Sequence, residues 1–140
     1  MENIKRYGGI LIKVGKEVLL CKRNLEGSLP GQWSIPAGKL GKRENPEAGA
    51  LREFFEETNI ELLDEIKLVG FIKRFSRDGS SVKGLFYVFM AESEEKIYPD
   101  LENAVDGDEH TECGYFNINN LPLKKDDQLY KLIKNILSKS

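Results

Sequence analysis

The segment GKLGKRENPEAGALREFFEETNI, residues 38–60, decides the expected fold because it predicts a helix with charges gathered on one side. Pro46 suits the first helical position, and Asn45 suits the N-cap before it. Asn59 tolerates positive φ better than most residues, so we expect it to end the helix in a left-handed turn. Gly38 is expected to give the backbone a tight turn ahead of this helix.

At about 100° per residue, the predicted helix has two distinct faces. The face expected to join the core comprises Ala48, Leu51, Phe54, Phe55 and Thr58. The other comprises Gly49, Arg52, Glu53, Glu56 and Glu57, and Glu44 can join it from the preceding loop. A charged face is usually only solvated, but like charges three or four positions apart cost a helix a few tenths of a kcal/mol per pair. Mg²⁺ reverses that sign because it prefers carboxylate oxygens, so the pattern favours a metal platform.

The spacing of this segment closely resembles the Nudix box, Gly-x5-Glu-x7-Arg-Glu-apolar-x-Glu-Glu-x-Gly-apolar. The matching positions are Gly38, Glu44, Arg52, Glu53, Glu56, Glu57 and Ile60. Six fixed positions would match by chance with a probability of order 10⁻⁷ per window. Asn59 replaces the last glycine of the box, and because both residues tolerate a left-handed turn we expect helix end and chemistry to survive. The likeness is close over residues 33–60 and loose elsewhere.

The resemblance implies an α/β fold, an α/β/α sandwich with a mixed curved sheet between the box helix and a C-terminal helix. The alternation of apolar residues and the turn signals predict strands over Gly8–Val14, Glu17–Arg23, Lys67–Phe75, Val82–Glu92 and Tyr115–Ile118. The first two form a hairpin, and Asp78-Gly79 is the turn between the third and fourth. Asp126 or Asp127 is expected to cap the final helix. Residues 24–32 are expected to form a turn-rich loop, and residues 1–140 a single domain.

Nudix hydrolases cleave diphosphate linkages with Mg²⁺, or with Mn²⁺ in its place, so the resemblance implies a metal site. Glu53 and Glu57 would be the main ligands. Glu44 and Glu56 would add a ligand or hold bound waters, and the carbonyl of Ala37 would complete the site. Arg52 would orient carboxylates, and a box glutamate is one candidate for the general base.

Residues 92–112 are rich in carboxylates and are expected to form a solvated loop. Its end is similar to a mobile loop that carries a Glu-His pair in many Nudix hydrolases. This likeness implies Glu109 first, and Glu112 second, as general base or additional metal ligand. His110 is interpreted as a loop residue or one behind the ligands, not as a ligand itself.

Two residues outside the box are candidates for substrate binding. Arg23 ends a strand, where it is either solvated or, as in similar proteins, in contact with a substrate phosphate. Trp33 is assigned to core packing first and to base stacking second. Most of the later aromatic residues are expected in the core, with one or two lining a base-binding cleft: Phe71, Phe75, Phe86, Tyr87 and Phe89.

Composition is that of an ordinary globular protein, with 40% hydrophobic residues and a net charge of −2. The absence of a basic surplus leaves nucleic acid as a partner only in the form of an RNA 5′ end used as substrate. No stretch reads as a signal peptide or membrane span, which predicts a cytoplasmic protein. Cys21 and Cys113 have no CxxC partner and are expected to be reduced.

These features predict a Nudix pyrophosphohydrolase that hydrolyses a nucleoside diphosphate linked to another moiety. A (deoxy)nucleoside triphosphate of the MutT-like kind is favoured, with nucleotide sugars and RNA ends next. The alternative is a catalytically silent Nudix-like module that senses nucleotides or binds proteins. An isoprenoid diphosphate isomerase is disfavoured because it needs histidine metal ligands, and the chain has one histidine. Many similar proteins dimerise, which makes a homodimer an open expectation.

Overall fold

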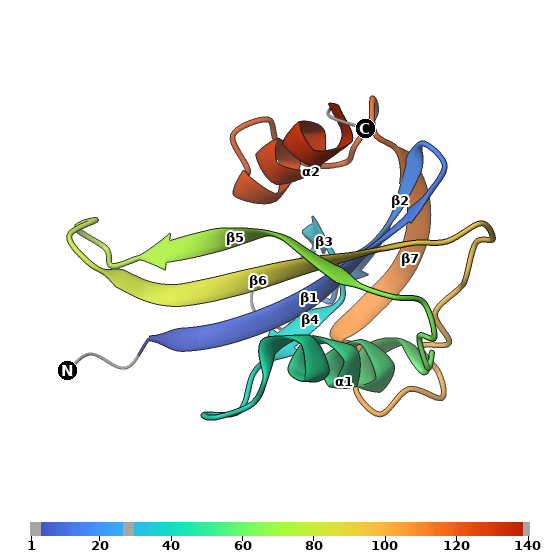
Figure 1. The fold of residues 1–140 in the computed structure, drawn as a ribbon, viewed down its shortest axis with the longest axis horizontal. Coiled ribbons are helices and arrows are strands. Elements are labelled where there is room, and N and C mark those ends of the chain that lie inside the picture. The colour runs from blue at the N-terminus through green and yellow to red at the C-terminus, as the bar shows by residue number, and fades with distance from the viewer. Residues whose placement is uncertain (1–3, 27–29, 139–140) are drawn as a thin grey trace.

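The computed structural model describes residues 4–26 and 30–138 and has three layers (Figure 1). Helix α1, Pro46–Thr58, lies on one face of a mixed sheet, and helix α2, Gln128–Ser138, lies on the other. The strands are β1 Lys5–Val14, β2 Glu17–Arg23, β3 Trp33–Ser34, β4 Ala37–Lys39, β5 Lys67–Phe75, β6 Val82–Glu92 and β7 His110–Asn117. A 3₁₀ turn, η1 Gly107–Glu109, precedes β7. The expected α/β/α sandwich is therefore confirmed.

Strand β1 lies at the centre of the sheet and pairs with three other strands along different parts of its length. It runs parallel to β6 from Lys5 to Lys13, and β6 pairs antiparallel with β5. On its other edge, β1 pairs with β4 through residues 7–9 and with β2 only near the hairpin turn. Beyond that turn β2 leaves β1 and pairs with β3 and β7 instead. The sheet therefore opens between β4 and β2.

Alternation along the strands divides the core between the two helices. Ile10 and Ile12 of β1 point toward α1 and pack with Phe54. Leu11 points the opposite way and packs with Ile133 of α2. Each helix therefore covers its own half of the core. Helix α1 lies over β1 and β4, and β4 contains Gly38, the first residue of the box.

The predicted ends of α1 are confirmed. The Asn45 side chain accepts a hydrogen bond from the Ala48 amide, and Pro46 follows at the start of the helix. Asn59 has a φ of 61° and donates its backbone N–H to the Phe55 carbonyl. The Asp127 side chain accepts the Leu129 amide at the start of α2, so the second of the two predicted caps is the one used.

The predicted faces of α1 were partly wrong. Ala48 is exposed and Phe55 is 44% exposed, whereas Gly49 and Glu57 are buried. The helix is rotated about its own axis relative to the prediction, because Ala50 and Phe54 are the residues that contact the strands. A face defined by periodicity alone did not anticipate that a glutamate would be taken into the core.

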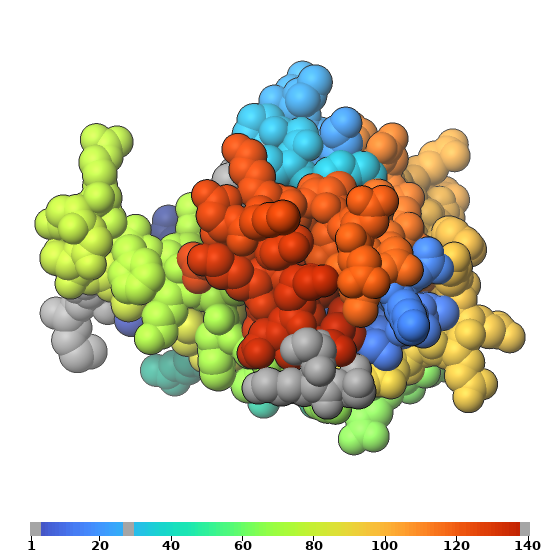
Figure 2. Space-filling view, turned by 90° about the horizontal axis from the view of Figure 1, so that it is seen from above, coloured from blue at the N-terminus to red at the C-terminus, as the bar shows by residue number. Residues whose placement is uncertain are grey.

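Several expectations outside the box also need correction. Strand β7 begins at His110 and not at Tyr115, so the acidic segment 92–112 ends inside the sheet, and His110 is buried. The short strands β3 and β4 were not predicted. Phe71 and Phe75 are 51% and 56% exposed, so neither belongs to the core. Phe75 is the last residue of β5, next to the turn of the β5–β6 hairpin, and this hairpin extends beyond both helices in Figure 1 and beyond α2 in Figure 2. Part of the predicted loop 24–32, residues 27–29, lies outside the described residues.

The prediction that both cysteines are reduced was wrong. Cys21 and Cys113 lie directly opposite each other on β2 and β7 and form a disulfide. They are separated by 92 positions, so only the pairing of these two strands brings them together.

Among the described residues, no helix has the length and apolarity needed to cross a membrane.

Candidate active site

Arg52 of α1 gathers three carboxylates around its guanidinium. Its Nε lies 2.8 Å from Glu44 Oε2, and its Nη1 lies 3.0 Å from Glu53 Oε1 and 3.1 Å from Glu56 Oε1. Hydrogen bonding from Arg52 is the main reason that the pKa of Glu44 is lowered to about 2, and the Gly41 amide adds to it. The same contacts raise the pKa of Arg52. Arg52 therefore fixes the positions of box carboxylates, as its predicted role requires.

Two glycines give these carboxylates room. A Cβ on Gly38 would overlap the carboxylate of Glu53, and a Cβ on Gly49 would come within 2.8 Å of the Glu44 carboxylate. Gly38 is not among the described residues with positive φ, so close approach, and not an unusual backbone conformation, explains the glycine. The close approach places Glu53 directly against the β4 backbone.

Glu57 is the only carboxylate among the fully buried side chains of the described residues. Its Oε1 accepts the Ala37 amide at 3.3 Å, and its Oε2 has no hydrogen-bond partner. Burial, and next the charge of Glu109, raises its pKa to about 9. An ionised carboxylate here is costly unless a cation lies beside it.

Glu109 is carried to the box by η1 and not by a loose loop. The Asp106 amide donates to the Glu56 carbonyl at 2.7 Å, and the Asn24 amide donates to the Glu109 carbonyl at 3.0 Å. Burial is the main cause that raises the pKa of Glu109, with Arg23 acting in the opposite direction. The charge of Glu109 also raises the pKa values of Glu53 and Glu57. Glu109 is therefore close enough to the box carboxylates to interact with them electrostatically, and we count it with them as one carboxylate group.

Glu112, the second candidate, lies elsewhere. It is exposed on β7, where it pairs in register with Lys22 of β2, and it does not line the cleft described next. The structure thus separates the two candidates that sequence reasoning could only rank.

A cleft of about 390 Å³ lies where the sheet opens, next to the carboxylate group. Ala37, Gly38, Arg23 and Glu109 line the end near the box. The remaining lining includes Tyr7, Lys39, Ile72, Arg74, Phe86 and Trp33. It therefore joins an anionic end to an aromatic, partly cationic interior.

Trp33 packs against the core, as its first assignment predicted. Its ring packs edge-on against Phe116, with ring centroids 4.9 Å apart, and contacts the α2 half of the core. Trp33 also lines the cleft, and its second assignment, base stacking, stays a prediction. Sequence reasoning missed Tyr7, Lys39 and Arg74, because their meeting depends on the pairing of β1 with β4 and, through β6, with β5.

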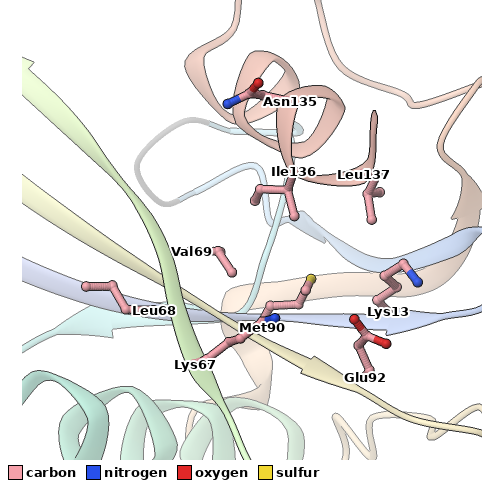
Figure 3. Close-up of a pocket in the computed structure, with 9 residues that line it drawn as sticks. All are labelled: Lys13, Lys67, Leu68, Val69, Met90, Glu92, Asn135, Ile136 and Leu137. Carbon is pink, nitrogen blue, oxygen red and sulfur yellow. The ribbon is translucent and has the colours of Figure 1, made fainter. Parts of the chain in front are cut away.

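Another cavity, of about 480 Å³, lies under the C-terminal half of α2. Ile136 and Leu137 project from the helix toward β5 and β6, and Lys13 and Glu92 lie at one end (Figure 3). Gly38 of the box and the nearby Glu109 line the smaller cleft and are not among the residues that line this cavity, so we assign the candidate active site to the smaller cleft.

The carboxylate oxygens are chemically suited to bind a divalent cation, but their present arrangement does not bring them together around one. Within the described residues, no three carboxylate, histidine or cysteine side chains converge closely enough to hold a metal. The reason is that Arg52 holds Glu44, Glu53 and Glu56, while Glu57 turns toward Ala37. The buried, unpartnered Oε2 of Glu57 and the repulsion from Glu53 and Glu109 nevertheless match the oxygen donors that Mg²⁺ prefers.

Comparison with known proteins supports this description of the fold. MutT NUDIX hydrolase from Burkholderia pseudomallei has a TM-score of 0.77 at 23% identity, covering 96% of this chain and 99% of that chain. MutT protein from Methanosarcina mazei Go1 has a TM-score of 0.74 at 19% identity, covering 99% and 96%. The NUDIX domain of Shewanella oneidensis NrtR, complexed with ADP ribose, has a TM-score of 0.70 at 15% identity, covering 98% and 90%. Among curated protein sequences, none matches.

The family comparison covers nearly the whole chain. The model of the NUDIX domain matches residues 4–136, which include the box, the residues that line the cleft, helix α1 and all but the last two residues of α2. The spacing that suggested the family, the sandwich fold and this match agree. The chain belongs to the Nudix family.

Proposed function

We propose that this protein is a metal-dependent pyrophosphohydrolase that cleaves the diphosphate linkage of a nucleotide, with a (deoxy)nucleoside triphosphate as the favoured substrate. The observation that carries the proposal is the electrostatic interaction of Glu53, Glu56 and Glu57 with Glu109, which lines one end of a cleft whose interior is aromatic and cationic. A phosphate chain needs cations at one end of such a site, and a base needs apolar surface at the other.

Glu57 and Glu53 would be the main metal ligands, with Glu56 and Glu44 supplying a further oxygen or holding waters. The carbonyl of Ala37 would complete the set, since the Ala37 amide already contacts Glu57. A bound Mg²⁺ would polarise the diphosphate and lower the pKa of the attacking water.

Glu109 would take the proton from that water. Burial raises the pKa of this carboxyl, which makes it a better base than an ordinary glutamate once ionised. Water would attack one phosphorus, and the bond from that phosphorus to the bridging oxygen would break. A nucleoside triphosphate would then yield a nucleoside monophosphate and pyrophosphate.

Other residues would orient the reactants. Arg52 would keep Glu44, Glu53 and Glu56 in place. Arg23 lines the cleft beside Glu109 and would contact a phosphate. Trp33 would lie against the nucleoside from the β3 side.

The test is product release from a panel of nucleoside triphosphates, dinucleoside polyphosphates, ADP-ribose and nucleotide sugars, with Mg²⁺ and with Mn²⁺. We expect metal-dependent turnover of one class, reduced at least 100-fold in Glu57→Gln. Glu47→Gln is the matched control because Glu47 is an exposed residue of the first turn of the same helix. Silence across the panel, combined with tight binding of a nucleotide, would favour the sensing module instead.

A further inference from the structure

Three buried side-chain atoms lack a hydrogen-bond partner in the described part of the chain: Glu57 Oε2, His110 Nδ1 and His110 Nε2. A buried polar group left unpaired is costly, because it loses its hydrogen bonds to water and gains none in return. All three belong to two side chains that face each other between α1 and the start of β7. Three unpaired buried polar atoms at one place call for a functional explanation.

The two side chains are held in place by their backbones. His110 pairs in register with Arg23 of β2, at the point where the β2–β7 ladder shifts. Its Nε2 lies 3.6 Å from Glu57 Oε1, and the two side chains are 0% and 1% exposed. That separation is just beyond hydrogen-bond length, so a small movement of the Glu57 side chain would close it.

The imidazole is well suited to donate to a carboxylate. The ring is fully buried, and Nε2 is the ring nitrogen that faces Glu57 Oε1. The Ala37 amide and the His110 ring both approach Oε1 of Glu57, which leaves Oε2 without a protein partner. A donor on one oxygen fixes the orientation of the carboxylate and therefore the direction of the other oxygen.

We propose that His110 is a positioning residue for the metal site: its Nε2–H donates to Glu57 Oε1 and so aims Glu57 Oε2 at the cation. This inference rests on the proposed function, because it assumes that Glu57 is a metal ligand. It assigns a specific atom and a specific hydrogen bond to the chain's only histidine.

The first test measures Mn²⁺ affinity from the electron paramagnetic resonance signal of free Mn²⁺. His110→Leu should bind Mn²⁺ about 10–100-fold more weakly than wild type, the usual cost of losing a group that orients a ligand. His110→Gln should recover most of the affinity, because its amide nitrogen can occupy the place of Nε2. Thermal unfolding of both variants separates this effect from a loss of folding.

The outcomes distinguish this inference from the proposed function. If wild type binds no Mn²⁺, or Glu57→Gln binds it equally well, the metal site itself is wrong. If Glu57→Gln loses affinity while His110→Leu does not, or His110→Gln fails to restore it, only the role of His110 is overturned.

A second test needs no substitution. Because the chain has one histidine, the imidazole nitrogens of ¹⁵N-labelled wild type can be assigned without ambiguity by NMR once any affinity tag is removed. In the Mg²⁺-loaded protein at pH 7 we expect the neutral tautomer with the proton on Nε2. A proton on Nδ1 would contradict the proposal even if both variants failed to fold.

Discussion

At the scale of single residues, the site depends on placing one carboxylate where water cannot reach it. Glu57 is fully buried, and its neighbours include the charges of Glu53 and Glu109. The protein accepts this cost at a position where a cation would offset it. Stability and function are thus expected to oppose each other at this residue.

This opposition predicts a particular pH dependence. Because the folded-state pKa of Glu57, about 9, lies above its ordinary value of 4.5, folding takes up a proton between these values. The stabilising contribution of the protonated form is complete below pH 4.5 and is lost as pH rises toward 9. The lowered pKa of His110, about 4, acts below pH 6.5 and in the opposite sense, so the window from pH 6.5 to 9 isolates Glu57.

In EDTA, the free energy of unfolding of wild type should therefore fall by about 2–3 kcal/mol from pH 6.5 to 9. Glu57→Gln should be nearly flat over the same range and more stable than wild type at pH 8.5. Urea denaturation of both proteins at several pH values measures this. Parallel curves for the two proteins would show that the buried carboxyl is not the cause.

At the scale of elements, a missing side chain on β4 makes room for a carboxylate of α1. Glu53 of α1 lies over Gly38 of β4, where even a methyl group would overlap its carboxylate. The nearest obstacle is the end of a flexible side chain, so the strand and helix can keep their positions if Glu53 turns away. The glycine of the box therefore protects a carboxylate position and not a backbone conformation.

Gly38→Ala should leave the thermal midpoint nearly unchanged but lower metal affinity and turnover by at least tenfold. Gly41→Ala is the matched control, because its Cβ would lie 3.5 Å from Glu44 Cβ in ordinary contact. Mn²⁺ titration and the substrate assay, run on both variants, provide the measurement. Equal affinity in the two variants would mean that Glu53 does not need its present place.

At the scale of the whole molecule, the second half of the chain is fixed to the first through β2 and β7. These strands carry the Cys21–Cys113 disulfide and the Arg23–His110 pair, and η1 with Glu109 precedes β7 directly. The position of Glu109, the proposed general base, thus depends on a pairing between segments about ninety residues apart.

Reduction of this disulfide should lower the free energy of unfolding by about 2–4 kcal/mol, because a bond that closes a loop of this length restricts the unfolded chain. Thermal unfolding with and without a phosphine reductant tests this, and the double variant Cys21→Ala, Cys113→Ala should not respond to the reductant. Alkylation of the denatured, unreduced protein should label neither cysteine. Two labelled thiols would contradict the bond.

Local sequence determined much of this protein. Asn45, Pro46 and Asn59 define the ends of α1 through capping and backbone preferences that act within a few residues, and the box spacing identified the family. The strands β2, β5 and β6 begin and end where their apolar patterns predicted. These features need only short-range interactions, so they can be read from short segments.

Tertiary structure alone decided which charged residues are buried and which segments meet. Periodicity placed Glu57 on an exposed face, yet packing of Ala50 and Phe54 against the sheet took it into the interior beside His110. The sequence could rank Glu109 above Glu112 but could not show where each residue lies. In the structure Glu109, just before β7, is close to the box carboxylates, whereas Glu112 on β7 is exposed. The disulfide was likewise missed. In each case the outcome depends on contacts between residues far apart in the chain, and no local pattern encodes the position of such a partner.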